Sequence, residues 1–255
     1  MSACAGKVVI VTGASGGLGK QTAISLAEAG AKVAICARRV DDLAQTAAQC
    51  EAAGAEVLAV PCDVSVRPDL ERFVDATVER FGGIDVLINN AATRSSPVPF
   101  ESQGTDDLDR YLHTGLYGCW TSMQLCYPHM KGKPSSIINF TSGAYREGTS
   151  GMAAYAADKA AIRAVSMVVA REWGKDGIRC NTISPAAMTD SMKESLPPEF
   201  LTWARDFMST SAMGRTGEPA TDIAPVVMFL ASDASQWITG QNINVDGGLS
   251  ATIFI

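Results

Sequence analysis

Short apolar runs alternate with longer amphipathic stretches along most of the chain. Most of the runs are rich in β-branched residues and carry no charge, which is typical of strands buried on both faces of a sheet. The pattern predicts strands at Val8–Val11, Val33–Ala37, Val57–Val60, Val86–Ile88, Ile137–Phe140, Arg179–Ile183 and Asn242–Val245.

Helical periodicity fills the intervals between these runs. It predicts helices near 18–29, 41–53, 67–81, 105–130, 153–174 and 219–232. Gly30, Gly54 and Gly82 or Gly83 fall where helix C-caps are expected. Strands separated by helices need crossover connections, so the sheet is expected to be mostly parallel and covered on both faces. No repeat or linker divides residues 1–255, and we expect one doubly wound α/β domain.

The stretch between Ile183 and Pro219 departs from this rhythm because it is long and apolar. Long connections in compact domains are often lids or binding loops. We therefore expect a substrate loop or lid near 186–218, and an ordinary extra helix pair packed on the core is the alternative. Its large apolar side chains are Met188, Met192, Leu196, Phe200, Leu201, Trp203, Phe207, Met208 and Met213.

Composition narrows the possible partners and locations. The chain has 21 Lys plus Arg against 27 Asp plus Glu, a net charge of −6, which argues against a nucleic-acid binder. It shows neither a long apolar run nor a secretory leader, so we expect no membrane span and a cytoplasmic protein. The 7 Cys form no CxxC pair and there are only 2 His, so we expect reduced, buried thiols and no metal site.

The first predicted strand leads into a glycine-rich turn, Thr12–Gly19, which reads T-G-A-S-G-G-L-G. Glycines let the backbone turn sharply and let a phosphate approach closely. The N–H groups at the start of the following helix attract the same phosphate. The pattern favours nucleotide binding over a glycine-rich turn without a ligand.

The end of the second predicted strand indicates which nucleotide is bound. An enzyme that selects NAD places Asp or Glu there, but this chain has Ala37 followed by Arg38 and Arg39. Two guanidinium groups suit the 2′-phosphate of NADP. We therefore expect NADP, with NAD possible because Asp42 lies nearby, and a solvated basic corner is the alternative.

Tyr155 and Lys159 lie one helical turn apart, on one face of a predicted helix. A phenol is a poor base at neutral pH, and a nearby ammonium stabilises its ionised form. Such a tyrosine can exchange a proton with a carbonyl or alcohol oxygen. Ser142, just after the fifth predicted strand, adds a hydroxyl for the same oxygen. An exposed helical pair without chemistry is the alternative.

Together these residues resemble the short-chain dehydrogenase/reductase family over essentially the whole chain. The motifs that carry the resemblance are Thr12–Gly19, Cys62-Asp63-Val64, Asn89-Asn90-Ala91, Ser142, Tyr155 with Lys159, Asn181-x-Ile183-x-Pro185 and Asp246-Gly247-Gly248.

The resemblance implies an NAD(P)-dependent oxidoreductase with a Rossmann-like sheet of about seven strands. It implies that Tyr155 is the acid/base, that Lys159 assists it and holds the nicotinamide ribose, and that Ser142 orients the substrate oxygen. The residues it places at the cofactor are Gly13, Ser15, Gly17, Leu18, Arg38, Arg39, Asp63, Val64, Asn90, Ala91, Tyr155, Lys159 and Thr189. It also implies a homo-oligomer, a tetramer or dimer, in which the apolar tail 251–255 suits a subunit contact.

Three positions depart from the family's pattern: Ala92 and Ala186 stand where the family has Gly, and Gly115 stands where many members have a catalytic Asn. In those members the Asn holds a water that links the active-site Lys to solvent. We expect water, His113 or Thr114 to complete a modified relay here.

We therefore expect an NADP(H)-preferring carbonyl reductase or secondary-alcohol dehydrogenase. Its small-molecule substrate is expected to be fairly apolar, cyclic or aromatic. Arg94 or Arg146 is a candidate for meeting an acidic group on it, and a solvated loop arginine without such a role is the more common alternative. The alternatives are a catalytically impaired nucleotide-binding subunit, motivated by Gly115, and a scaffold that has lost its ligand.

Overall fold

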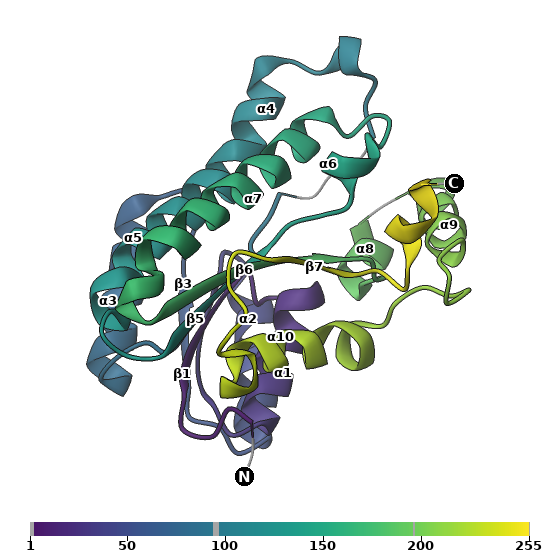
Figure 1. Ribbon diagram of the computed structural model, residues 1–255. Helices are drawn as coiled ribbons and strands as arrows, with labels where there is room; N and C mark the ends of the chain where they lie inside the picture. Colours follow the sequence, from purple (N-terminus) through teal and green to yellow (C-terminus); the bar gives the residue numbers. More distant parts are fainter. Residues whose placement is uncertain (1–2, 94–96, 196, 255) are drawn as a thin grey trace.

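The apolar runs pair into one parallel sheet in a computed structural model that describes residues 3–93, 97–195 and 197–254 (Figure 1). The seven strands lie in the order β3-β2-β1-β4-β5-β6-β7, which confirms the expected α/β fold. Each strand either matches its predicted run or is longer than it by one or two residues at one or both ends. The strands are β1 (Val8–Thr12), β2 (Lys32–Ala37), β3 (Val57–Pro61), β4 (Val86–Asn89), β5 (Ser135–Phe140), β6 (Ile178–Pro185) and β7 (Asn242–Val245).

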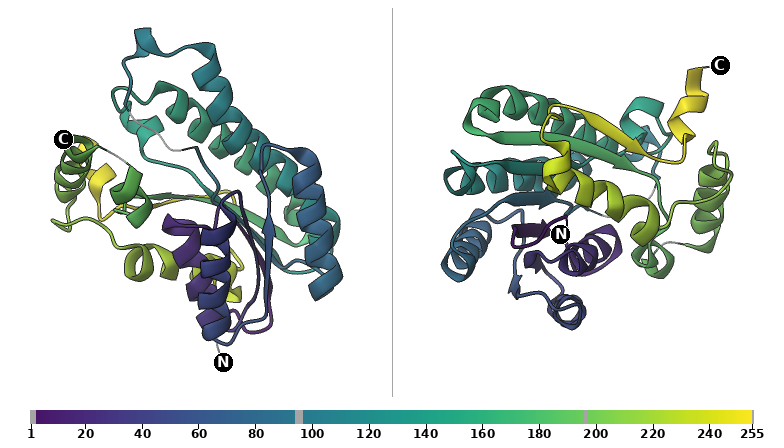
Figure 2. Two further views of the ribbon diagram at one scale, coloured as in Figure 1. Left: turned by 180° about the vertical axis from the view of Figure 1, so that it is seen from behind. Right: turned by 60° about the horizontal axis from the view of Figure 1, so that its bottom comes forward.

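Helices cover both faces of the sheet, as the crossover connections require (Figures 1 and 2). The helices α1, α2 and α10 pack on one face, and α3, α5 and α7 pack on the other. The helices are α1 (Gly17–Glu28), α2 (Val40–Ala52), α3 (Arg67–Phe81), α4 (Thr105–Leu112), α5 (Gly118–Met130), α6 (Ala144–Glu147), α7 (Ala153–Trp173), α8 (Asp190–Ser195), α9 (Pro198–Ser209) and α10 (Ala224–Ala231). Within the described ranges, none of them has the length and apolarity needed to cross a bilayer.

The two helical layers enclose two separate apolar cores, one on each face of the sheet. Along β1 the side chains alternate between them: Val9 and Val11 join one core, and Ile10 joins the other. This period of two is the geometry of a pleated strand. Because β1, β2 and β4 are buried on both faces, their sequences are mostly apolar. The strands β5 and β6 also bury polar side chains, among them Ser136, Asn139 and Asn181. All seven cysteines are free and buried.

The predicted helix 105–130 is not one continuous α-helix. A π-helical segment, η2 (His113–Tyr117), separates α4 from α5. The segment η4 (Pro219–Ile223), which precedes α10, is also π-helical. Such wide turns leave some backbone groups without their usual α-helical partners, and they are frequent at functional sites. Hydrophobic periodicity does not distinguish them from α-helix.

The stretch near 186–218 contains two helices, α8 and α9. Its role as a substrate loop or lid stays a prediction. Leu196, one of its predicted apolar residues, lies outside the described residues. The helix pair lies beyond the ends of β6 and β7, on the same side of the molecule as α6 and the C-terminus (Figure 1).

Asp222 links the start of η4 to the preceding loop through hydrogen bonds, and these bonds lead to a prediction about stability. Its carboxylate accepts two hydrogen bonds from Arg215, of 2.6 and 2.9 Å, and one of 2.7 Å from the backbone N–H of Glu218. The Arg215 guanidinium and this N–H lower the pKa of Asp222 from 3.8 to about 2. The contribution of Asp222 is therefore fully present above pH 3.8 and is lost as the pH falls through about 2.

We expect Asp222→Asn to lower the free energy of unfolding at pH 7 by about 1 kcal/mol, a value reduced for solvent screening. The difference from wild type should shrink as the pH falls toward 2. Urea unfolding at several pH values measures both quantities. Asp75→Asn, an exposed position in α3, is the control and should show no such convergence.

Candidate active site

A cavity of about 850 Å³ opens at the carboxyl ends of the strands. Ligands bind at this edge in open parallel sheets. Every catalytic and cofactor-binding residue predicted from the sequence lines it, so the structure brings these residues together. These residues are Gly13, Ser15, Gly17, Leu18, Arg38, Arg39, Asp63, Val64, Asn90, Ala91, Ser142, Tyr155, Lys159 and Thr189.

The glycine turn after β1 is locked against the end of β4. Gly13 has φ +69°, and a Cβ at this position would lie 2.7 Å from the Cα of Ala91. Asn90 donates from Nδ2 to the carbonyl oxygens of Thr12 and Gly13, at 2.9 and 3.2 Å. Thr12 Oγ1 accepts the N–H groups of both Asn90 and Ala91, each at 3.1 Å. Glycine at 13 is therefore required both by its backbone angle and by the space available.

The two arginines after β2 have different surroundings. Arg39 donates to the carbonyl oxygen and the hydroxyl of Ser15 and pairs with Asp42 at 3.0 Å. Arg38 has a 68% exposed side chain, and its ion pair with Asp63 is long, at 3.6 Å. Arg38 is thus the guanidinium more available to a ligand, whereas Arg39 braces the glycine turn.

The proton-transfer candidates come from β5 and α7. Ser142 follows β5, and its Oγ accepts the N–H of Ala144 at 3.3 Å. Tyr155 lies in the first turn of α7, with its ring edge-on to Tyr111 at 6.0 Å. Lys159, one turn later, is buried and places its Nζ 5.6 Å from the centre of the Tyr155 ring. A hydroxyl, a phenol and an ammonium therefore face one cavity, and this set can hold and protonate a carbonyl oxygen.

Comparison with known proteins identifies the family. A family model described as "Enoyl-(Acyl carrier protein) reductase" matches residues 13–250. The chain is 36% identical over 254 residues to the 12alpha-hydroxysteroid dehydrogenase of Clostridium sp., with 96% of each chain covered. The chain belongs to the short-chain dehydrogenase/reductase family. This confirms the resemblance seen in the motifs, and it makes the protein an oxidoreductase.

Solved structures of other short-chain dehydrogenases/reductases share the whole fold. Levodione reductase superposes with a TM-score of 0.91 at 33% identity, covering 97% of this chain and 99% of that one. A 7 alpha-hydroxysteroid dehydrogenase solved with NADH and 7-oxo glycochenodeoxycholic acid gives a TM-score of 0.88 at 32% identity, covering 96% and 94%. The family thus uses nicotinamide dinucleotides, and the choice between NAD and NADP is open at this level.

The helix α9 supplies an apolar wall to the cavity of this short-chain dehydrogenase/reductase. Phe200, Trp203 and Phe207 stack along it, with ring centres 5.2 and 5.5 Å apart. All three line the cavity. Several of the apolar residues flagged between Ile183 and Pro219 therefore reach the site, and these three reach it from a helix.

Of the two arginines proposed for an acidic substrate group, the structure describes one, Arg146. Arg94 lies outside the described residues. Arg146 lies in α6 and is not among the residues that line the cavity. Arg110 of α4 does line it, and sequence reasoning missed this residue because it belongs to no motif. It pairs with Asp107 at 3.0 Å.

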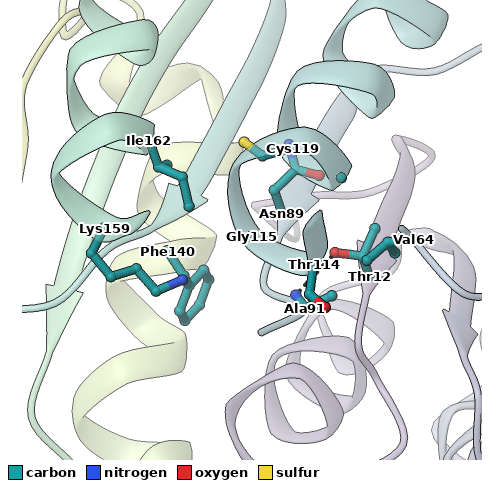
Figure 3. Close-up of a pocket in the computed structure, with 11 residues that line it drawn as sticks. Thr12, Val64, Asn89, Ala91, Thr114, Gly115, Cys119, Phe140, Lys159 and Ile162 are labelled. Atoms are coloured by element: carbon teal, nitrogen blue, oxygen red, sulfur yellow. Dashed lines mark hydrogen bonds between the residues drawn. The ribbon is translucent and has the colours of Figure 1, made fainter. Parts of the chain in front are cut away.

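Gly115 lies in η2, and its surroundings differ from the expected relay. His113 is exposed and packs its ring on Tyr117 at 5.0 Å, so it does not serve Lys159. Thr114 remains near, since with Lys159 it lines a second cavity of about 10 Å³, roughly the space of one water (Figure 3). The neighbour that Gly115 does have is Asp158, which sequence reasoning overlooked because it is an unmarked position between Tyr155 and Lys159.

Proposed function

We propose that the protein is an NADP(H)-preferring carbonyl reductase or secondary-alcohol dehydrogenase for a fairly apolar, cyclic or aromatic substrate. One observation carries the proposal: Ser142, Tyr155 and Lys159 line the same cavity as the glycine turn and the stacked rings of α9. The relatives include dehydrogenases named for a 12alpha-hydroxysteroid and for (+)-borneol. A substrate of that apolar, ring-shaped kind matches the α9 wall.

The residues present fit a nicotinamide dinucleotide. Gly13 and Gly17 both have positive φ values, of +69° and +57°, and neither places a side chain in the cavity that they line. Asp63 and Val64 line the part of the cavity near Arg38, where we propose that the adenine lies. Asn90, Ala91 and Thr189 also line the cavity, beside the glycine turn. When bound, the cofactor supplies or accepts the hydride at the substrate carbon.

The proton is handled by the chain itself. In ketone reduction, the Tyr155 hydroxyl donates its proton to the carbonyl oxygen as the oxygen gains negative charge, and in alcohol oxidation the phenolate takes the proton back. The Ser142 hydroxyl donates a hydrogen bond that holds the same oxygen. The Lys159 ammonium stabilises the phenolate through the favourable interaction of opposite charges. This cluster is retained, so the alternative of an impaired subunit gains no support from the site.

The proposal is tested by titrating the purified protein with NADPH and with NADH. The fluorescence of Trp203, which lines the cavity and is 45% exposed, should report binding. A turnover assay with cyclohexanone, tetralone and a keto steroid then follows. We expect tighter NADPH binding and reduction of at least one ring ketone. Binding of neither nucleotide would overturn the proposal, and tighter NADH binding would overturn only the NADP preference.

Arg38→Ala tests that preference directly. Removing a guanidinium that meets a 2′-phosphate should weaken NADPH binding at least about tenfold and leave NADH binding nearly unchanged. Arg67→Ala is the matched control, because Arg67 is an exposed arginine of α3 that pairs with Glu71 and does not line the cavity. Equal losses for both nucleotides in Arg38→Ala would contradict the assignment.

We also propose a homo-oligomer, a dimer or tetramer, in the cytoplasm. Mass measurement by light scattering distinguishes these assemblies from a monomer.

A further inference from the structure

The carboxylate of Asp158 occupies the space that a side chain at position 115 would fill. A Cβ built on Gly115 would overlap both carboxylate oxygens of Asp158. Oδ1 accepts the backbone N–H of Leu116 at 2.8 Å, so one oxygen is fixed by the π-helical segment η2. The two positions come from different elements, η2 and α7, which lie against each other. Glycine at 115 is therefore the condition for an acidic residue at 158.

The same carboxylate forms a buried ion pair with the active-site lysine. Asp158 Oδ2 lies 3.5 Å from Lys159 Nζ, and the two side chains are only 2% and 4% exposed. Burial raises the pKa of Asp158, whereas the Lys159 charge and the Leu116 N–H oppose that rise. A charge buried this deeply is retained only where a partner compensates it. Asp158 is thus the carboxylate that faces the Lys159 ammonium.

We infer that Asp158 is a positioning residue: it holds the Lys159 ammonium between η2 and the cavity and offsets part of the field that this ammonium exerts on Tyr155. The inference rests on the proposed function, in which Lys159 stabilises the Tyr155 phenolate. A negative charge beside an ammonium cancels much of its field at a third group several ångströms away. Asp158 therefore sets the pH range in which Tyr155 acts as a base.

Two further elements face the ion pair and Tyr155. Cys119 of α5 interacts electrostatically with both Lys159 and Asp158. Burial raises the pKa of the Cys119 thiol so far that it stays neutral. From α4, Tyr111 packs on Tyr155, and Arg110 lies 5.4 Å from the centre of the Tyr111 ring. Burial raises the pKa of Tyr111 as well. Within the described residues, Asp158 is the carboxylate paired with the active-site ammonium.

The test is Asp158→Asn, which keeps the size of the side chain and an oxygen for the Leu116 N–H but removes the charge. Two readouts are compared with wild type. The first is the near-ultraviolet absorbance change on ionisation of Tyr155, isolated by subtracting the titration of the matching Tyr155→Phe protein. The second is the pH profile of secondary-alcohol oxidation. We expect both midpoints to move to lower pH by about one unit, because the ammonium field is no longer offset.

Asp85→Asn is a closely matched control. Asp85 also pairs one oxygen with a lysine, Lys133 at 2.7 Å, and the other with a backbone N–H, that of Val8 at 2.8 Å. It does not line either cavity, so its loss should leave both midpoints unchanged. Midpoints that stay fixed or move to higher pH in Asp158→Asn would overturn the inference. The absorbance titration needs no turnover, so a wild type that reduces nothing would defeat the proposed function separately.

A second variant covers the case in which Asp158→Asn does not fold. Gly115→Asn alone should lose thermal stability, because its side chain overlaps the Asp158 carboxylate. Combined with Asp158→Ser, the same change should be accommodated and should recover most of that loss. The double variant also lacks the charge, so its Tyr155 midpoint should move down as in Asp158→Asn. Strictly additive losses of stability would contradict the spatial pairing of the two positions.

Discussion

Tyr155→Phe is expected to lower kcat for ketone reduction about a thousandfold while leaving the Kd for NADPH within about twofold. The substitution removes one hydroxyl and keeps the ring that packs on Tyr111. The substitution removes the proposed donor of the proton to the developing alkoxide. Steady-state kinetics with a ring ketone measures the first quantity, and fluorescence titration measures the second.

Tyr127→Phe is the control for that experiment. Tyr127 donates its hydroxyl to Asp176 at 2.8 Å and does not line the cavity. Its loss should cost about 1 kcal/mol of stability and leave kcat unchanged. If Tyr155→Phe kept near wild-type turnover, Tyr155 would not be the acid/base.

Gly19→Ala is expected to weaken binding of either nucleotide at least about a hundredfold. A Cβ at Gly19 would lie 2.6 Å from the carbonyl oxygen of Gly13 and would overlap the Asn90 amide. Since Asn90 holds the glycine turn through two hydrogen bonds, the added methyl displaces the backbone that a pyrophosphate must approach. Isothermal titration with NADPH and NADH measures the loss.

Gly104→Ala is the matched glycine control. Gly104 precedes α4 with φ −86°, and a Cβ there would meet only a backbone nitrogen at 3.9 Å. It should bind both nucleotides as wild type does. Circular dichroism checks that Gly19→Ala is folded. Asn90→Ala, which removes the two hydrogen bonds without adding an atom, should weaken binding in the same direction by a smaller factor. Unchanged affinity in both site variants would exclude this turn from nucleotide binding.

The sheet could be predicted because each strand contains a short run rich in apolar residues, and the central strands are buried on both faces. Val86–Asn89 and Asn242–Val245 are short, yet both were located to within one residue. The site residues that carry a motif, such as Gly13 and Tyr155, could also be found, since their chemistry fixes their spacing. These local signals do not depend on which distant elements meet.

The features that the sequence did not reveal depend on contacts between elements that are distant along the chain. The π-helical segment His113–Tyr117 carries no periodic signature of its own. Asp158 looks like an ordinary helical position until η2 and α7 are placed side by side. The helices α8 and α9 lie in the stretch for which a substrate loop or lid and a helix pair were both considered, because apolar content alone does not separate a packed helix from a covering loop.

The fit between Gly115 and Asp158 also constrains how this chain can change. An asparagine at 115 is sterically blocked while the carboxylate is present, so residue 158 must become smaller before residue 115 can gain a side chain. The order of substitutions is therefore fixed by space, and the two positions are epistatic. A chimera that imports α4 to α5 from an asparagine-bearing relative should fail unless it also imports the first turns of α7.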